Sequence, residues 1–127
     1  MKVHFYSFQD GKKDVSYITE YEVISPNTYR FLDKSVENTY ITLTIKSNSN
    51  VVIRREGMVN SLMEFKQNES TSSIYKTSDL TFKFEILTKE IKINSNSISI
   101  DYDYFYESSL VSHIKIALLF KDLILIN

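Results

Sequence analysis

The chain has 127 residues, of which 43% are hydrophobic and 24% charged, and its 15 basic residues nearly balance 16 acidic ones. This length and composition fit one soluble globular domain with its own core. The formal charge of −1 gives no net field that would attract nucleic acid or an anionic membrane. The absence of cysteine excludes disulfide frameworks and thiolate metal sites. No apolar run reaches the roughly 18 residues of a membrane helix, and the N-terminus does not resemble a signal peptide, so we expect a cytoplasmic protein.

The first fifty residues contain four segments with the pattern of a β-strand. In the clearest of them Ile41, Leu43 and Ile45 occupy one face, and threonine and lysine occupy the other. A helix would scatter this period-two alternation around its surface. The links between the segments are rich in Asn, Asp, Ser, Gly and Pro, whose chemistry favours turns. We therefore expect strands near residues 2–8, 15–24, 28–32 and 39–46.

The same alternation continues through the middle of the chain. Phe82 and Phe84 share a face with Leu80 and Ile86, and threonine, lysine and glutamate lie between them. Gly57 is one of only two glycines in the chain, and we expect it to supply a positive φ between two strands. Strands are predicted here near residues 51–56, 59–66, 71–77, 80–87 and 89–94.

The most regular strand is SISIDYDYFY, residues 97–106, and a further strand is expected near 110–120. The even positions of SISIDYDYFY carry two isoleucines and three tyrosines, whereas serine and aspartate alternate with them up to residue 103. An amphipathic strand of this kind buries its apolar face. We therefore predict that Tyr102 and Tyr104 point into the protein and that Asp101 and Asp103 face water.

Many short strands with few helical signals are typical of a sandwich or of a closed up-and-down barrel. We expect some neighbouring segments to merge, which leaves eight to ten strands. The short links and the lack of a long crossover favour the barrel, and closure also removes exposed strand edges. The prediction is one all-β domain over residues 1–127, an antiparallel up-and-down β-barrel with an apolar C-terminal extension at 121–127.

Several residues from position 51 onward also match a known pattern. Arg55 is followed by Gly57 at a strand turn, and Tyr75 and the pair Thr88-Lys89 come at the expected spacings. Leu80 departs from the pattern, which often has glycine at this position and a bend after the Tyr75 strand. Over roughly residues 51–120 the chain resembles the YwiB-like proteins, small uncharacterised bacterial β-barrels of the calycin, or lipocalin-like, type. The resemblance implies an antiparallel barrel of eight to ten strands, and it implies no established activity.

A barrel of about eight strands is either packed solid or just wide enough to hold one small ligand. The inward aromatic side chains are therefore core, pocket lining or both. Arg55 also has two interpretations, because its fork of donors suits both a rim residue that closes the barrel end by bonding loop carbonyls and a ligand-binding residue. The residues predicted to line a ligand site are Arg55, Tyr75, Phe82, Phe84, Tyr102 and Tyr104.

Two polar arrangements are weak candidates for chemistry. Asp101 and Asp103 are roughly 7 Å apart along one strand face, a spacing compatible with inverting glycosidases, but nothing nearby would raise the pKa of only one of them. His4 and His113 lack the further ligands that a metal site needs. The chain has no GxSxG, P-loop or GxGxxG motif. We therefore expect no enzymatic activity, no metal and no cofactor.

The C-terminal segment KDLILIN contains four consecutive large aliphatic residues, Leu123 to Ile126. Such a run cannot alternate between core and solvent, so both of its faces need cover. This predicts either a homodimer contact through the C-terminal strand or a tail that folds back over one barrel end.

Two functional classes remain open from the sequence. The first is a binding module that holds a small apolar or amphipathic molecule in the barrel, which an open cavity of roughly 300 Å³ or more would favour. The second is a structural or protein-interaction module with a packed barrel, acting through its outer surface or its tail, which an exposed apolar patch would favour.

Overall fold

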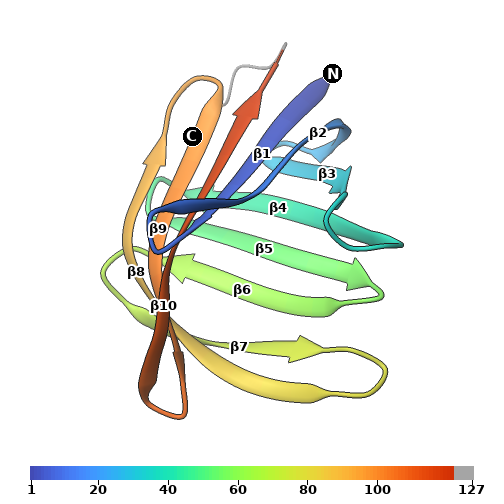
Figure 1. The fold of residues 1–127 in the computed structure, drawn as a ribbon. Coiled ribbons are helices and arrows are strands. Elements are labelled where there is room, and N and C mark those ends of the chain that lie inside the picture. Colours follow the sequence, from blue (N-terminus) through green and yellow to red (C-terminus); the bar gives the residue numbers. More distant parts are fainter. Residues whose placement is uncertain (122–127) are drawn as a thin grey trace.

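The computed structural model describes residues 1–121, and this part of the chain forms ten antiparallel strands (Figure 1). The strands are β1 (Lys2–Gln9), β2 (Lys12–Ser25), β3 (Thr28–Leu32), β4 (Thr39–Ser47), β5 (Asn50–Gly57), β6 (Asn60–Lys66), β7 (Ser70–Lys76), β8 (Thr81–Ile93), β9 (Ser97–Tyr106) and β10 (Ser109–Phe120). Within residues 1–121 no helix has the length and apolar character needed to cross a bilayer.

The predicted all-β fold and the number of strands are confirmed. The two segments predicted at 80–87 and 89–94 are one strand, β8, whose pairing with β9 shifts between Thr88 and Glu90. A bulge at this point adds one residue and bends the strand without ending it. The alternation of side chains is interrupted there, which is why the sequence pattern divides into two pieces.

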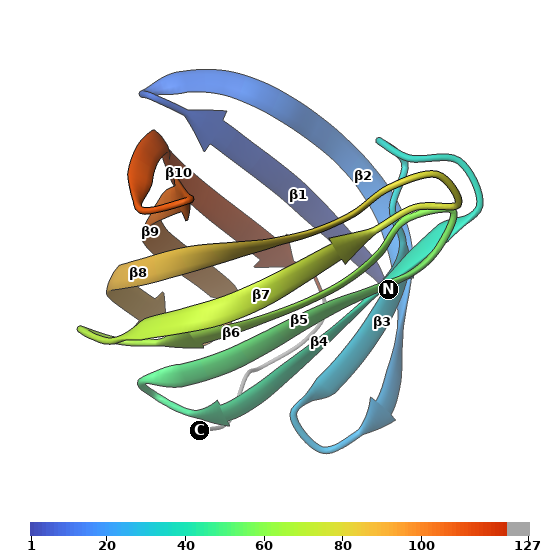
Figure 2. The ribbon, with the colours of Figure 1, turned by 90° about the horizontal axis from the view of Figure 1, so that it is seen from below.

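The sheet closes on itself because β1 pairs with β10 as well as with β2. The closing ladder runs from Val3 opposite Phe120 to Gln9 opposite Ile114. Every other pairing joins strands that are adjacent in sequence, so the fold is the up-and-down barrel that short links predict. Figure 2 shows the strands arranged around a common interior.

The two ends of the barrel are built differently. The turns at residues 10–11, 33–38, 58–59, 77–80 and 107–108 lie at one end, here called the mouth. At the opposite, closed end, the ring of Phe120 packs against Tyr21 and Tyr29, with centroids 5.1 and 5.2 Å away. The Tyr21 hydroxyl donates a hydrogen bond of 3.0 Å to the carbonyl of Lys121. Aromatic rings therefore fill the barrel at this end.

The predicted orientation of β9 is confirmed. Tyr102 is buried, with 6% of its surface exposed, and Tyr104 is half-buried and packs against the core. Asp101 and Asp103 lie on the outer face of the same strand. The prediction for the C-terminal segment falls, apart from Lys121, outside the described residues.

Gly57 has the positive φ that was predicted, +145°. It lies opposite Thr39 in the ladder of β4 and β5, where the loop before β4 runs very close to it. A Cβ at position 57 would lie 1.9 Å from the carbonyl oxygen of Asn38. Only glycine fits this crossing of two backbone segments.

We expect Gly57→Ala to lower the free energy of unfolding by about 2–4 kcal/mol, because it combines a strained φ with a backbone clash. Gly11→Ala is the matched control: Gly11 also has a positive φ, +83°, but a Cβ there would meet nothing within 4 Å. Urea unfolding of both variants tests this. Equal losses of stability in the two variants would show that the Asn38 contact is unimportant.

Candidate ligand cavity

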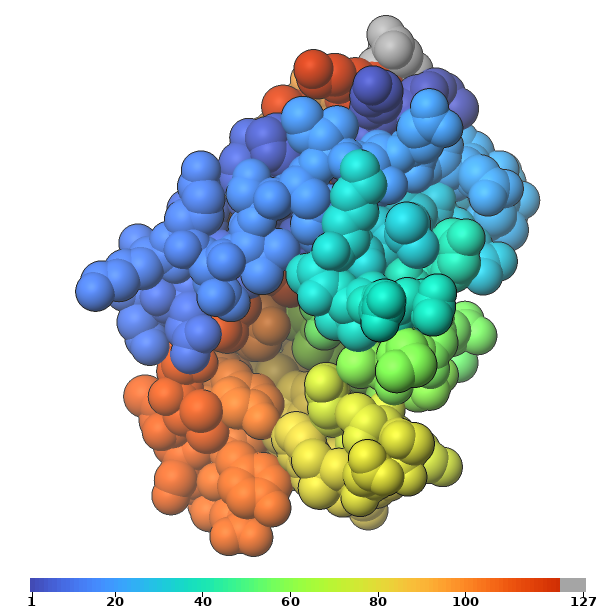
Figure 3. Space-filling model, turned by 45° about the vertical axis from the view of Figure 1, so that its right-hand side comes forward, coloured from blue at the N-terminus to red at the C-terminus, as the bar shows by residue number. Residues whose placement is uncertain are grey.

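A cavity of about 310 Å³ lies inside the barrel next to the mouth. In the space-filling view a hollow opens between the blue β1–β2 segment, the orange β9–β10 hairpin and the yellow β7–β8 region (Figure 3). The lining combines aromatic, aliphatic and a few polar side chains: Phe5, Ser7, Gln9, Arg55, Met63, Tyr75, Phe82, Phe84, Tyr102, Tyr104, Val111, Ser112, Ile114 and Ile116.

All six residues predicted to line a ligand site meet in this cavity. Four of them form a continuous aromatic wall across β7, β8 and β9. Ring centroids are 5.0 Å apart for Tyr75 and Phe82, 6.1 Å for Phe82 and Phe84, and 4.8 Å for Phe84 and Tyr104. Antiparallel pairing brings Tyr75 directly opposite Phe82, so the strand register holds these rings together.

Arg55 points into the cavity from the end of β5, and its partner is a carboxylate rather than the loop carbonyls that the sequence suggested. Its Nε lies 3.2 Å from Oδ2 of Asp33, although the N–H is not aligned for a hydrogen bond. Asp33 is 1% exposed, and its Oδ1 accepts hydrogen bonds from the backbone N–H and the hydroxyl of Ser35, at 2.9 and 2.5 Å. The loop at 33–38 is thus folded around a buried negative charge.

Two tyrosines surround this ion pair. Burial, followed by the negative charge of Asp33, raises the pKa of Tyr17, whose buried hydroxyl makes no aligned hydrogen bond. Burial also raises the pKa of Tyr102 to about 12, although the positive charge of Arg55 acts in the opposite direction. Both hydroxyls therefore stay protonated at neutral pH and remain able to donate hydrogen bonds.

The sequence did not single out several of the other lining residues. Phe5, Ser7 and Gln9 occupy alternate positions along β1, so they share one face of this strand. Period-two alternation therefore identifies them as inward-facing once the strand is known to be part of a barrel. Asp33 had no such signal, because the sequence Asp-Lys-Ser at 33–35 is typical of a solvent-exposed turn. Only the folded chain brings this carboxylate to Arg55.

The outer face of β9 carries a separate cluster around His113. Its Nδ1 lies 2.9 Å from Oδ1 of Asp103 and its Nε2 lies 2.9 Å from Oδ1 of Asp101, while Nζ of Lys89 lies 3.0 Å from Asp103. Both ring nitrogens can donate at once only when the imidazole is protonated. The two aspartates face outward as predicted, and the imidazole of His113 lies between them.

The second histidine does not join this cluster. His4 bonds Ser16 and Tyr6, at 3.0 and 2.8 Å, and it pairs with Leu119 rather than with the His113 end of β10. Among residues 1–121 no group of three or more His, Asp or Glu side chains is arranged to hold a metal ion.

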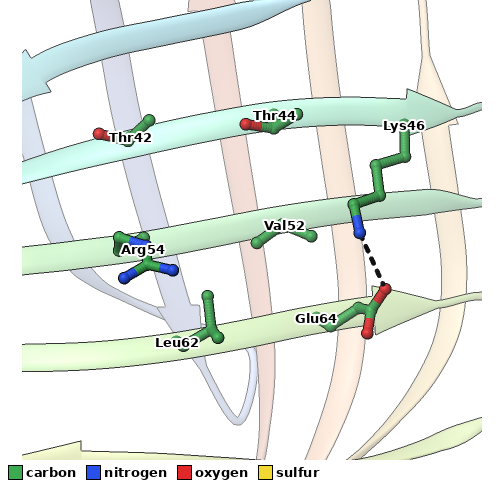
Figure 4. A pocket seen from close by; sticks show the side chains of 7 residues that line it. All are labelled: Thr42, Thr44, Lys46, Val52, Arg54, Leu62 and Glu64. Atoms are coloured by element: carbon green, nitrogen blue, oxygen red, sulfur yellow. Dashed lines mark ion pairs between the residues drawn. The ribbon is translucent and has the colours of Figure 1, made fainter.

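A second hollow of about 310 Å³ lies on the outer surface of β4, β5 and β6 (Figure 4). Its side chains stand along the outer faces of three adjacent strands: Thr42, Thr44, Lys46, Val52, Arg54, Leu62 and Glu64. Lys46 and Glu64 form an exposed ion pair of 3.6 Å across it. Exposed pairs of this kind contribute little energy, and none of the polar side chains that line this hollow among residues 1–121 is buried, so we assign it no binding role.

Residues 8–118 match the family model described as Domain of unknown function (DUF1934). The chain belongs to this family. Among solved structures it is similar to the crystal structure of the ywiB protein from Bacillus subtilis, with a TM-score of 0.65, 18% sequence identity, and coverage of 94% of this chain and 90% of that chain. This likeness shows a shared fold and confirms the resemblance to YwiB-like proteins. No curated protein matches the chain.

The raised pKa of Tyr102 predicts a loss of stability at alkaline pH. The phenol ionises near pH 10 in the unfolded chain and only near 12 in the DUF1934 barrel, so unfolding becomes easier as the pH rises through this interval. We expect the free energy of unfolding to fall less steeply between pH 10 and 12 in Tyr102→Phe than in the wild type. Identical slopes in urea unfolding series would contradict this.

The cluster around His113 predicts that the free energy of unfolding also falls at acid pH. Burial of Asp103 opposes its ionisation, but hydrogen bonds from His113 and Lys89 outweigh burial and lower its pKa. The stability from this carboxylate is therefore present above its unfolded pKa of about 3.9 and is lost as the pH falls through the lower folded value. The destabilisation caused by Asp103→Asn, measured by urea unfolding, should shrink from pH 5 to pH 2, and a constant difference would be the contrary result.

Proposed function

We propose that this DUF1934 protein binds a small amphipathic molecule in the cavity at the barrel mouth. The observation that carries the proposal is the cavity itself. Its volume of about 310 Å³ lies at the lower end of the range for small-molecule pockets, about 300–1,000 Å³. It is mainly apolar, with a few polar groups, and this is the usual composition of a ligand site.

Exposed apolar side chains lie at the mouth end of the barrel, where a ligand would enter the cavity. Met58 and Leu80 are exposed and lie in the mouth turns 58–59 and 77–80, and Leu110 is exposed in β10 just after the turn at 107–108. Val111 is also exposed and lines the cavity directly. These apolar side chains at the mouth end are compatible with the entry of a partly apolar ligand.

A protein-interaction role is the second candidate, and one observation favours it. Leu62 and Ile74 are exposed on the outer face, and they lie directly opposite each other where β6 pairs with β7. The pair is small compared with the area that a stable interface needs, roughly 800 Å² per partner. The cavity is therefore the stronger argument.

A pair of serine-to-phenylalanine variants tests the proposal. Ser7 lines the cavity, so Ser7→Phe should fill it. We expect the binding of the neutral fluorescent probe N-phenyl-1-naphthylamine to weaken by about tenfold or more, since tenfold corresponds to about 1.4 kcal/mol and the apolar surface that the probe buries in the pocket contributes at least this much. Ser72 is exposed on β7, and Ser72→Phe should bind the probe like the wild type. Native mass spectrometry of the purified protein would show any molecule that co-purifies.

Two results would contradict the proposal. The first is equal binding of the probe by both variants and the wild type, which would place the probe on the outer surface. The second is a wild-type protein that neither binds the probe nor carries a co-purified molecule.

A further inference from the structure

We propose that the cavity selects a small amphipathic anion, with a carboxylate-like head group on Arg55 and an apolar body against the aromatic wall. This inference rests on the proposed function and adds the chemical class of the ligand.

The charge of the lining is the first argument. Among the described residues that line the cavity, Arg55 is the one side chain that carries a charge at neutral pH, and no carboxylate lines it. Asp33 pairs with Arg55 from outside the lining. A ligand in the cavity therefore contacts a lining that contains the Arg55 guanidinium and, among the described residues, no carboxylate.

The geometry of the guanidinium is the second argument. Asp33 approaches the Nε side, and within residues 1–121 it is the one carboxylate that forms an ion pair with Arg55. The donors on the two Nη atoms remain, and a guanidinium matches a carboxylate or phosphate through two parallel N–H groups. The Arg55 side chain is 24% exposed and lines the cavity, so it is accessible to a ligand although Asp33 is buried.

The negative charge of Asp33 is stabilised by other groups besides the guanidinium of Arg55. Its other oxygen accepts two hydrogen bonds from Ser35, and hydrogen bonds to an ionised carboxylate stabilise that charge independently of the ion pair. Arg55 can therefore lie between two carboxylates, one from the protein and one from the ligand. The fixed Asp33 orients the arginine before the ligand arrives, which reduces the entropy lost on binding.

The neighbouring hydroxyls add further donors. Tyr102 and Tyr104 both line the cavity, and burial raises the pKa of each, so both remain neutral and able to donate. A ligand with an anionic acceptor gains charge-assisted hydrogen bonds, roughly twice as strong as neutral ones. A cationic ligand of the same shape would meet the charge of Arg55 and find no carboxylate in the lining.

Three probes of nearly the same shape test this selectivity: 4-phenylbutyrate, the neutral 4-phenylbutanamide and the cation 4-phenylbutylammonium. In isothermal titration calorimetry we expect the carboxylate to bind about tenfold or more tightly than the amide, in keeping with the greater strength of charged hydrogen bonds. The ammonium should bind more weakly than both.

The role of Arg55 is tested with a neutralised pair. Arg55→Gln alone would leave Asp33 buried without a counter-charge, which is strongly destabilising, so Asp33→Asn is introduced with it. This double variant should bind the carboxylate and the amide equally. Arg54→Gln is the matched control, because Arg54 is exposed on the outer face of the same strand, and it should keep the preference for the carboxylate.

The outcomes separate this inference from the proposed function. An amide that binds as tightly as the carboxylate, or a double variant that keeps the preference, would overturn the anion selectivity. If N-phenyl-1-naphthylamine binds and Ser7→Phe blocks it, while none of the three phenylbutyl probes binds, the cavity holds ligands but the anionic class is wrong. If the naphthylamine also fails to bind and no molecule co-purifies with the protein, the proposed function falls together with the inference.

Discussion

The antiparallel pairing of β1 with β10 is the constraint on which the rest of the structure depends. It joins the first and last strands from Val3 to Gln9 of β1, so each of the ten strands has a neighbour on both sides. Once the sheet is closed, alternate side chains of every strand share one interior. The aromatic residues of distant strands meet there because closure leaves them no other apolar surroundings.

The interior is filled unevenly, and the lengths of the strands give a reason. At the closed end, rings from β2, β3 and β10 pack together. Toward the mouth, β2 continues well beyond β3, since β3 has only five residues and their pairing begins at Tyr21 opposite Phe31. The loop at 33–38 takes the place of a longer β3 there, and it contributes Asp33 to the ion pair. The mouth therefore combines an opening in the barrel wall with a charged residue at its edge.

The sequence predicted those features that depend on local alternation. The inward direction of Phe82, Phe84, Tyr102 and Tyr104 follows from period two within single strands, and it needs only the decision that the strands share an interior. For this reason, the predicted ligand-site residues come together in one cavity although nothing in the sequence specifies its size.

Features that depend on contacts between distant segments could not be predicted. Asp33 lies in a turn-like sequence, and its burial becomes visible only when the loop is packed against Arg55. The position of His113 between Asp101 and Asp103 depends on the register of β9 with β10, which shifts near Leu110. The bulge in β8 likewise interrupts the alternation, so one long strand gives two short sequence patterns.

The central claim is that a closed ten-stranded barrel encloses a hollow beside Arg55 that opens at the mouth. A high-resolution crystal structure of the protein tests this most directly. We expect a continuous ladder between β1 and β10, and solvent or ligand density in a space bounded by Arg55, Phe82 and Tyr104. An open gap between the first and last strands, or aromatic side chains folded inward to fill that space, would contradict the account.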